Sequence, residues 1–189
     1  SRPGIGPHAR LRMFKDSVAR LGAFPAQDKI ISLTEMAREM APTMVVAGEA
    51  IRWLMQELLP SVPPDCKVPL LYVVDSIFKN VKEPYISLAT NLIVAAVCEA
   101  FRVASSQDRD RLVRLTKLWQ RQTPPVFPPS IFQAIYGYFQ PWIDQKLAQQ
   151  SGARAAPLAH RHQPPKPVGY ATATIQSAPN GHQRRKRLR

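Results

Sequence analysis

The sequence predicts an all-helical domain followed by a tail of different composition. Over residues 10–150, apolar side chains recur three and four positions apart, the spacing of one face of an α-helix. Most prolines and glycines of this region fall between these stretches. The chain has no stretch of alternating apolar and polar residues bounded by turn residues, as a strand would have. Helices are therefore expected over residues 11–21, 28–40, 43–59, 67–81, 85–103, 108–121 and 131–149.

The first expected helix has a clear pattern and a clear end. Leu11, Phe14, Val18 and Leu21 lie at 3-4-3 spacing, and Gly22 follows directly. Glycine commonly ends a helix because it adopts the left-handed conformation without strain. The flank before the domain, residues 1–9, contains proline and glycine and is expected to be disordered.

The second and third expected helices are bounded by a capping residue and by prolines. Asp28 can cap the second helix, and Pro42 marks its end. Pro60 is expected to end the third helix, with Pro63 and Pro64 forming a turn after it.

The stretch from Lys67 to Val81 has two different faces. Its apolar stripe consists of Leu70, Val73, Val74, Ile77 and Val81. The opposite side gathers five polar groups, those of Tyr72, Asp75, Ser76, Lys79 and Asn80. Asp65 can cap this helix, and Pro69 is early enough to be tolerated near its first turn. The pattern fits a binding surface, but taken alone it is more typical of the solvated face of an amphipathic helix.

The later helices are expected to form the centre and the end of the domain. Residues 85–103 are apolar around most of the circumference, which predicts one long central helix packed on two sides. Ser105 or Ser106 can cap the helix that follows. In the last helix, Pro141 interrupts the apolar stripe and is expected to kink or split it.

The net charge of +13 is unevenly distributed. Residues 151–189 contain eight Lys or Arg and no Asp or Glu, whereas residues 1–150 have a net charge of +5. Few large aliphatic side chains occur after residue 150, so this tail is expected to be disordered. Its basic end, residues 184–189, is compatible with a solvated tail, a nuclear import signal or an RNA contact.

The sequence gives no indication of catalysis, and we expect no enzyme, no metal and no cofactor. Every histidine lies outside residues 10–150, so that region offers no Ser/His/Asp or Cys/His set. The two cysteines, Cys66 and Cys98, have no His or Cys neighbour at metal-binding spacing. No apolar run approaches the length of a membrane span.

Two adjoining motifs carry a resemblance to a known family. They are Lys-Val-Pro-Leu-Leu-Tyr at residues 67–72 and Asp-Ser-Ile-x-Lys-Asn at residues 75–80. Together they resemble the signature helix of CTD-interaction domains, which bind the heptad-repeat tail of the largest subunit of RNA polymerase II. Residues 85–94 and 115–119 also resemble this family, and the likeness covers roughly residues 10–150. The sequence is most similar to the version in the Pcf-type subunit of the mRNA cleavage and polyadenylation machinery.

The resemblance implies both a fold and a function. The fold would be a right-handed superhelical stack of about seven or eight helices over residues 10–150. The function would be binding of the phosphorylated polymerase tail in the nucleus, coupling transcription to mRNA 3′-end cleavage, polyadenylation and termination. Other cleavage and polyadenylation factors would be further partners. The chain is expected to be a monomer without membrane contact.

The resemblance also assigns roles to the polar side of the 67–81 helix. Asp75 would accept a hydrogen bond from the ligand's tyrosine hydroxyl, and Asn80 would bond the peptide backbone. Ser76 and Lys79 would line the same groove, and Tyr72 its edge.

Arg114 is the candidate phosphate ligand. It lies five positions before Trp119, where relatives that read a phosphoserine directly have an arginine. A guanidinium can bind phosphate through two parallel hydrogen bonds. The alternative is a solvated basic face, because Arg111, Lys117 and Arg121 lie on the same helix.

Two other functions remain open at the level of sequence. VHS- or ENTH-type trafficking adaptors share the superhelical architecture and bind sorting motifs or phosphoinositides, and the basic flanks are compatible with such ligands. The Asp-Ser-Ile-x-Lys-Asn motif argues against that class. The third candidate is RNA binding through the tail.

Overall fold

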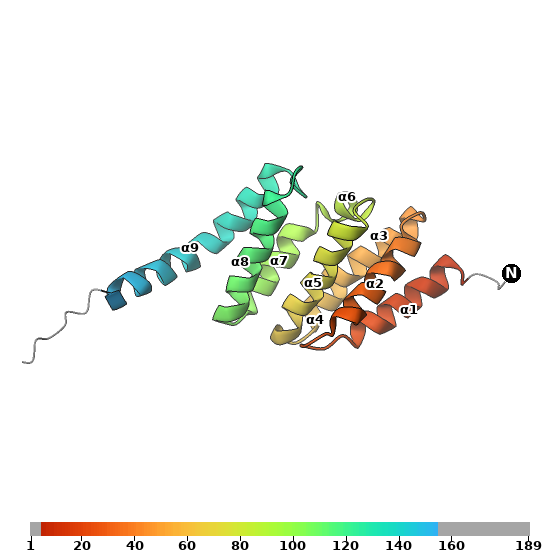
Figure 1. The fold of residues 1–189 in the computed structure, drawn as a ribbon, viewed down its shortest axis with the longest axis horizontal. Helices are drawn as coiled ribbons and strands as arrows, with labels where there is room; N and C mark the ends of the chain where they lie inside the picture. Colours follow the sequence, from red (N-terminus) through yellow and green to blue (C-terminus); the bar gives the residue numbers. More distant parts are fainter. Residues whose placement is uncertain (1–4, 155–189) are drawn as a thin grey trace, which may run out of the picture. The chain divides into compact units, whose positions relative to one another are not determined.

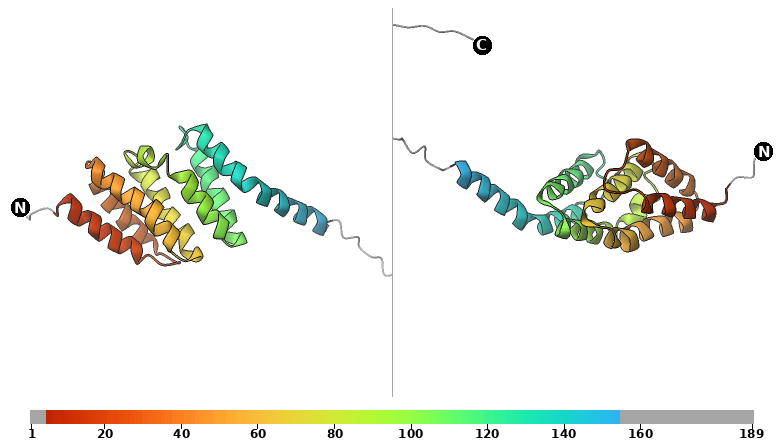
Figure 2. Two further views of the ribbon diagram at one scale, coloured as in Figure 1. Left: turned by 180° about the vertical axis from the view of Figure 1, so that it is seen from behind. Right: turned by 90° about the horizontal axis from the view of Figure 1, so that it is seen from below.

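A computed structural model of the chain describes residues 5–154, and these residues contain helices and no strand. The all-helical prediction is confirmed. Nearly all of the expected tail, with its basic cluster at 184–189, lies outside the described residues. The principal helices are α1 (Pro7–Ala19), α2 (Gln27–Met40), α3 (Met44–Arg52), α5 (Pro64–Asn80), α6 (Tyr85–Ala89), α7 (Ile93–Val103), α8 (Ser106–Arg121) and α9 (Pro129–Arg154). They follow one another from α1 at one end to α9 at the other (Figures 1 and 2).

The helix starts differ from the predictions in three places. α1 begins at Pro7, so residues 7–9 belong to a helix rather than to the flank. Neither α2 nor α5 is capped by an aspartate, since Asp28 and Asp65 lie within the first turns. There their charge still favours the positive end of the helix dipole. The predicted cap of α8 is correct: the Ser105 hydroxyl oxygen accepts the backbone N–H of Asp108 at 3.1 Å.

The third helical run continues through Pro60 rather than ending there. Residues 53–58 form a π-helical segment (Trp53–Leu58), followed by the short α4 (Leu59–Ser61). The carbonyls of Leu59 and Pro60 accept hydrogen bonds from the buried Lys67 ammonium at 2.6 and 3.1 Å. Burial lowers the pKa of Lys67. With α3, the π segment and α4 counted as one run, the described residues form eight helices.

The prediction of one helix over residues 85–103 is wrong. The chain forms α6 and α7, separated by a turn at residues 90–92. The Thr90 hydroxyl donates to the Ile86 carbonyl at 2.9 Å, and the Leu92 N–H bonds the Ala89 carbonyl at 2.8 Å. Threonine and asparagine offer the backbone such local alternatives to the helix. The break allows α6 to pack on α3 while α7 packs on α9.

Pro141 does not split α9. The helix is continuous from Pro129 to Arg154. Pro141 cannot bond the carbonyl of Gly137, but both residues are exposed, so water can satisfy that carbonyl.

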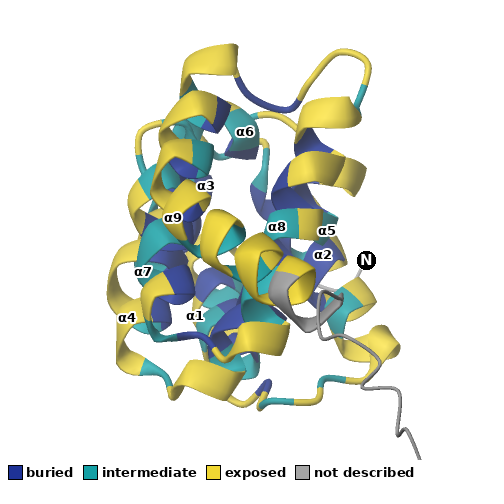
Figure 3. Ribbon diagram, turned by 90° about the vertical axis from the view of Figure 1, so that its left-hand side faces the viewer, coloured by how far each residue is buried: buried dark blue, intermediate teal, exposed yellow. Residues whose placement is uncertain are grey.

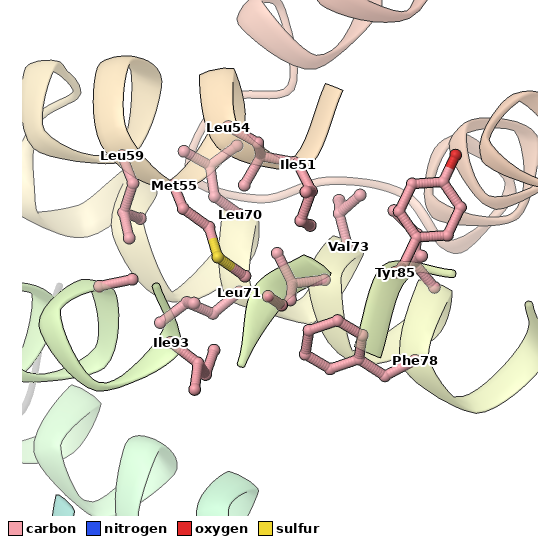
Figure 4. Packing of buried hydrophobic residues seen from close by; sticks show 14 of the residues in the cluster. Ile51, Leu54, Met55, Leu59, Leu70, Leu71, Val73, Phe78, Tyr85 and Ile93 are labelled. Carbon is pink, nitrogen blue, oxygen red and sulfur yellow. The ribbon is translucent and has the colours of Figure 1, made fainter. Parts of the chain in front are cut away.

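The core lies along the contact between α5 and the helices around it. Figure 4 shows side chains from the α3–α4 run, α5, α6 and α7 interdigitating around Leu71 and Phe78. The buried Tyr85 hydroxyl donates to the Ala37 carbonyl at 2.7 Å, and burial raises its pKa. Exposed residues cover the outer surfaces of the helices (Figure 3). None of the helices in residues 5–154 is long and apolar enough to cross a bilayer.

Candidate functional site

Three helices, α2, α5 and α8, run side by side in the same direction. The residue numbers of the contacts between α2 and α5 rise along both helices, from Thr34 with Ser76 to Arg38 with Asn80, so the two helices are parallel. A cavity brings Tyr72 of α5 together with Arg111 of α8, and the contact between Asp75 and Trp119 lies further along both helices. The polar side of α5 therefore lies between its two neighbours.

A cavity of about 520 Å³ lies at the N-terminal ends of these helices. We call it the α2–α5–α8 cavity. Its apolar lining includes Ile30, Val68 and Pro69, and two aromatic residues border it, Phe24 and the half-exposed Tyr72. The Phe24 side chain is 96% exposed, unusual for an aromatic residue on a folded surface. The volume is in the range of typical small-ligand sites.

The Asp75 carboxylate lies one helical turn beyond Tyr72, which borders this cavity, and it is held from two sides. Oδ1 accepts the indole N–H of Trp119 at 2.7 Å, and Oδ2 accepts the Lys79 ammonium at 2.7 Å. The Trp119 ring is completely buried and makes edge contacts with Phe78 and Phe127. Because the ring cannot move without disturbing the core, its N–H fixes the orientation of Asp75.

Ser76 and Asn80 form a directed chain of hydrogen bonds to α2. The Thr34 hydroxyl donates to the Ile30 carbonyl at 2.7 Å, so the Ser76 hydroxyl, 2.8 Å from it, acts as the donor to Thr34. The Asn80 amide nitrogen donates to the Ser76 hydroxyl and carbonyl oxygens at 3.2 and 2.9 Å. Within residues 5–154 the Asn80 amide oxygen has no donor and is available to a ligand N–H.

Arg114 lies one helical turn beyond Arg111 on the same side of α8. It is exposed and makes no hydrogen bond or ion pair with the described residues. Arg111, by contrast, is paired with Asp108 at 2.8 Å. Leu118, half-exposed, lies one further turn along this side.

Comparison with known proteins identifies the family. The model of the CID domain matches residues 14–135 of this chain. The chain belongs to the CID domain family. The resemblance to CTD-interaction domains, the family's full name, is thereby confirmed.

Two individual proteins are similar to this CID. An uncharacterized protein of Schizosaccharomyces pombe is 31% identical over 134 residues, which are 68% of this chain and 20% of that protein. The chain thus spans about a fifth of the length of that relative. The crystal structure of the RPR of Pcf11 matches with a TM-score of 0.60 and 23% identity, over 68% of this chain and 97% of that one. This match confirms the expected superhelical stack.

The structure brings five of the six predicted site residues of the CID together. Tyr72 borders the cavity, Lys79 bonds Asp75, and Asn80 bonds Ser76, all on the polar side of α5. Arg114 is on the neighbouring helix and takes part in neither of these two bonded pairs. Their ligand roles stay predictions.

Sequence reasoning missed three contributors to the site. Trp119 carries no site role in the sequence analysis, yet its indole N–H holds Asp75. Thr34 accepts a hydrogen bond from the Ser76 hydroxyl. Its only signal in the sequence is a polar residue between the buried Leu33 and Ala37. Phe24 lies in a loop, where spacing gives no information about packing.

The Trp119–Asp75 contact predicts a stability difference between two substitutions. Asp75→Ala leaves the buried indole N–H without an acceptor, a loss of about 1–3 kcal/mol. Asp75→Asn keeps a side-chain carbonyl oxygen for that N–H, and we expect a loss below about 1 kcal/mol. Urea unfolding followed by circular dichroism measures both.

Asp144→Ala is the matched control, because the Asp144 carboxylate bonds only Gln140 among the described residues. It should change the free energy of unfolding by less than about 0.5 kcal/mol. Equal stability of Asp75→Ala and this control would show that the indole contact does not stabilise the domain.

Proposed function

We propose that this CID binds the phosphorylated heptad-repeat tail of RNA polymerase II in the nucleus. It would thereby couple transcription to mRNA 3′-end cleavage, polyadenylation and termination, together with other factors of that machinery. The observation that carries the proposal is the fixed Asp75 carboxylate, one helical turn from a cavity that has apolar walls and is bordered by aromatic residues.

The cavity suits the side chains of the heptad. A ligand with a tyrosine and two prolines per repeat needs apolar walls, and Ile30, Pro69 and Tyr72 provide them. A tyrosine ring in the cavity would bring its hydroxyl toward Asp75, one turn beyond Tyr72 on α5. A charge-assisted hydrogen bond of this kind is worth roughly 1.5–3 kcal/mol.

The amide group of Asn80, held by Ser76, suits the backbone of a peptide ligand. The heptad has few charged side chains of its own, so its backbone groups need partners. The free amide oxygen of Asn80 can accept a backbone N–H of an extended ligand. The bonds from Asn80 to Ser76 hold that oxygen in place before binding, which lowers the entropic cost of association.

Electrostatics favour a phosphorylated ligand. The exposed guanidinium of Arg114 has no acidic partner among residues 5–154. A phosphate of charge about −1.5 to −2 would gain most from such a group. Arg114 is therefore the proposed phosphate ligand.

The first test is a titration of labelled heptad peptide, phosphorylated on the serine that follows its tyrosine. We expect a dissociation constant of order 10⁻⁴ to 10⁻⁶ M, because ordering a disordered peptide offsets part of the contact energy. Asp75→Asn should weaken binding roughly tenfold, since a charged acceptor becomes a neutral one. Asp144→Asn, a matched exposed control, should bind like the wild type.

Equal binding by Asp75→Asn and the wild type would refute the role of Asp75. Binding of phosphoinositide vesicles without binding of the peptide would instead favour a trafficking adaptor.

The second test concerns Arg114. Arg114→Ala should weaken binding of the phosphopeptide about 5- to 30-fold and leave the unmodified peptide almost unchanged, because only the phosphate loses its partner. Raising the salt concentration should narrow the difference between the two peptides, since exposed charges are screened over about 8–10 Å. Isothermal titration of both peptides at low and high salt measures these effects.

Arg12→Ala, on the remote α1 helix, controls for the loss of one positive charge. If Arg114→Ala weakens both peptides equally, Arg114 supports the binding surface and does not bind phosphate. If it weakens neither peptide, Arg114 belongs to the solvated face of α8.

A further inference from the structure

Two charged residues on the polar side of α5, Asp75 and Lys79, form an ion pair in the ligand-free domain. The Lys79 ammonium lies 2.7 Å from Asp75 Oδ2, one turn along α5. The lysine side chain is 38% exposed and the aspartate side chain 14%. The ammonium therefore lies on the solvent side of the pair, where a ligand can reach it.

We propose that Lys79 is a phosphate-sensing residue. When a ligand hydroxyl binds Asp75, the Lys79 ammonium leaves that carboxylate and pairs with a phosphate of the ligand. This inference rests on the proposed function and adds a second phosphate-reading group to it. It differs from the proposal for Arg114 because it links phosphate recognition to the occupancy of Asp75.

The geometry decides which bond of Asp75 a ligand can replace. The bond to Oδ1 comes from Trp119, which is completely buried and held by aromatic neighbours. The bond to Oδ2 comes from a lysine on a flexible four-carbon stem. An exposed ion pair four residues apart on a helix is weak. Of these two bonds, the one from Lys79 is therefore the one that an incoming hydroxyl can displace.

The charges then couple the two events. A tyrosine hydroxyl that displaces the ammonium from Oδ2 leaves Lys79 without its close ion-pair contact. An unmodified ligand offers nothing in return. A ligand phosphate within about one helical turn of that hydroxyl offers an anion of about two charges, a stronger partner than the shared carboxylate. Phosphate on the ligand should thus favour the same rearrangement that frees Asp75.

The other charged groups nearby do not replace Lys79 in this role. Arg38 bonds the backbone carbonyl of Asn80 at 3.1 Å and pairs with Glu35 at 3.5 Å. Arg111 is paired with Asp108. Among the polar residues of this part of α5, only Lys79 is a cation that contacts the proposed acceptor of the ligand.

The experiment compares wild type, Lys79→Gln, Lys79→Arg and Lys29→Gln with heptad peptides that are unmodified or phosphorylated on a single serine. Lys29→Gln is the matched control, because Lys29 is an exposed lysine facing the α1 side of α2. The quantity measured is the phosphate preference, the ratio of the two dissociation constants.

Lys79→Gln should lower this preference about 5- to 10-fold for at least one phosphoserine position. The same variant should bind the unmodified peptide up to about threefold more tightly, because Asp75 is already free. Lys79→Arg should retain the preference, and Lys29→Gln should behave like the wild type.

Three results would overturn the inference, and they have different meanings. An unchanged preference in Lys79→Gln would leave peptide binding intact and remove Lys79 from phosphate recognition. Equal weakening toward both peptides would make Lys79 part of the groove wall. A wild type that binds neither peptide would refute the proposed function, and the inference with it.

Discussion

The hydrogen bond from the Trp119 indole N–H to Asp75 connects the core of this domain to its candidate binding surface. The indole belongs to a cluster of aromatic rings with Phe78 and Phe127. Its N–H would cost free energy if buried without an acceptor. Asp75 supplies that acceptor and is in turn fixed one helical turn beyond Tyr72, which borders the cavity. One contact thus satisfies a buried donor, links α5 to α8 and orients the carboxylate that a ligand would meet.

The same arrangement explains why polar residues can lie along one side of α5, a helix that is largely buried. The Ser76 hydroxyl donates a hydrogen bond to the Thr34 hydroxyl, which donates its own hydrogen bond to a backbone carbonyl of α2. The Ser76 hydroxyl, the Lys79 ammonium and the Asn80 amide each have an acceptor within the domain, so these side chains are ordered without a ligand. The amide oxygen of Asn80 and the guanidinium of Arg114 have no partner among residues 5–154. In the proposed function, these open groups would meet the backbone and the phosphate of the peptide.

Much of the fold could be predicted from spacing alone, because the apolar stripes of α1, α2, α5 and α8 are regular. The polar face of α5 was also visible in the sequence, since helical geometry places Asp75 and Lys79 one turn apart. The break between α6 and α7 was missed because the apolar pattern runs through it, while local bonds of Thr90 and the separate packing partners decide the structure. The partners of Asp75 and Ser76 could not be predicted, because Trp119 and Thr34 are 44 and 42 residues away in the sequence. Contacts at that separation depend on how helices pack, which periodicity does not specify.

The indole N–H resonance of Trp119 in a nitrogen–proton correlation spectrum tests the central role of Asp75 most directly. The chain contains three tryptophans, and Trp53 and Trp142 lie on other helices, where they serve as internal controls. Titration with heptad phosphopeptide should shift the Trp119 signal with the same saturation as binding and leave the other two in place. Asp75→Asn should move the Trp119 signal in the free domain and reduce its response to the peptide. Saturable peptide binding that leaves the Trp119 signal unmoved would contradict the assignment of Asp75 as the anchor of the site.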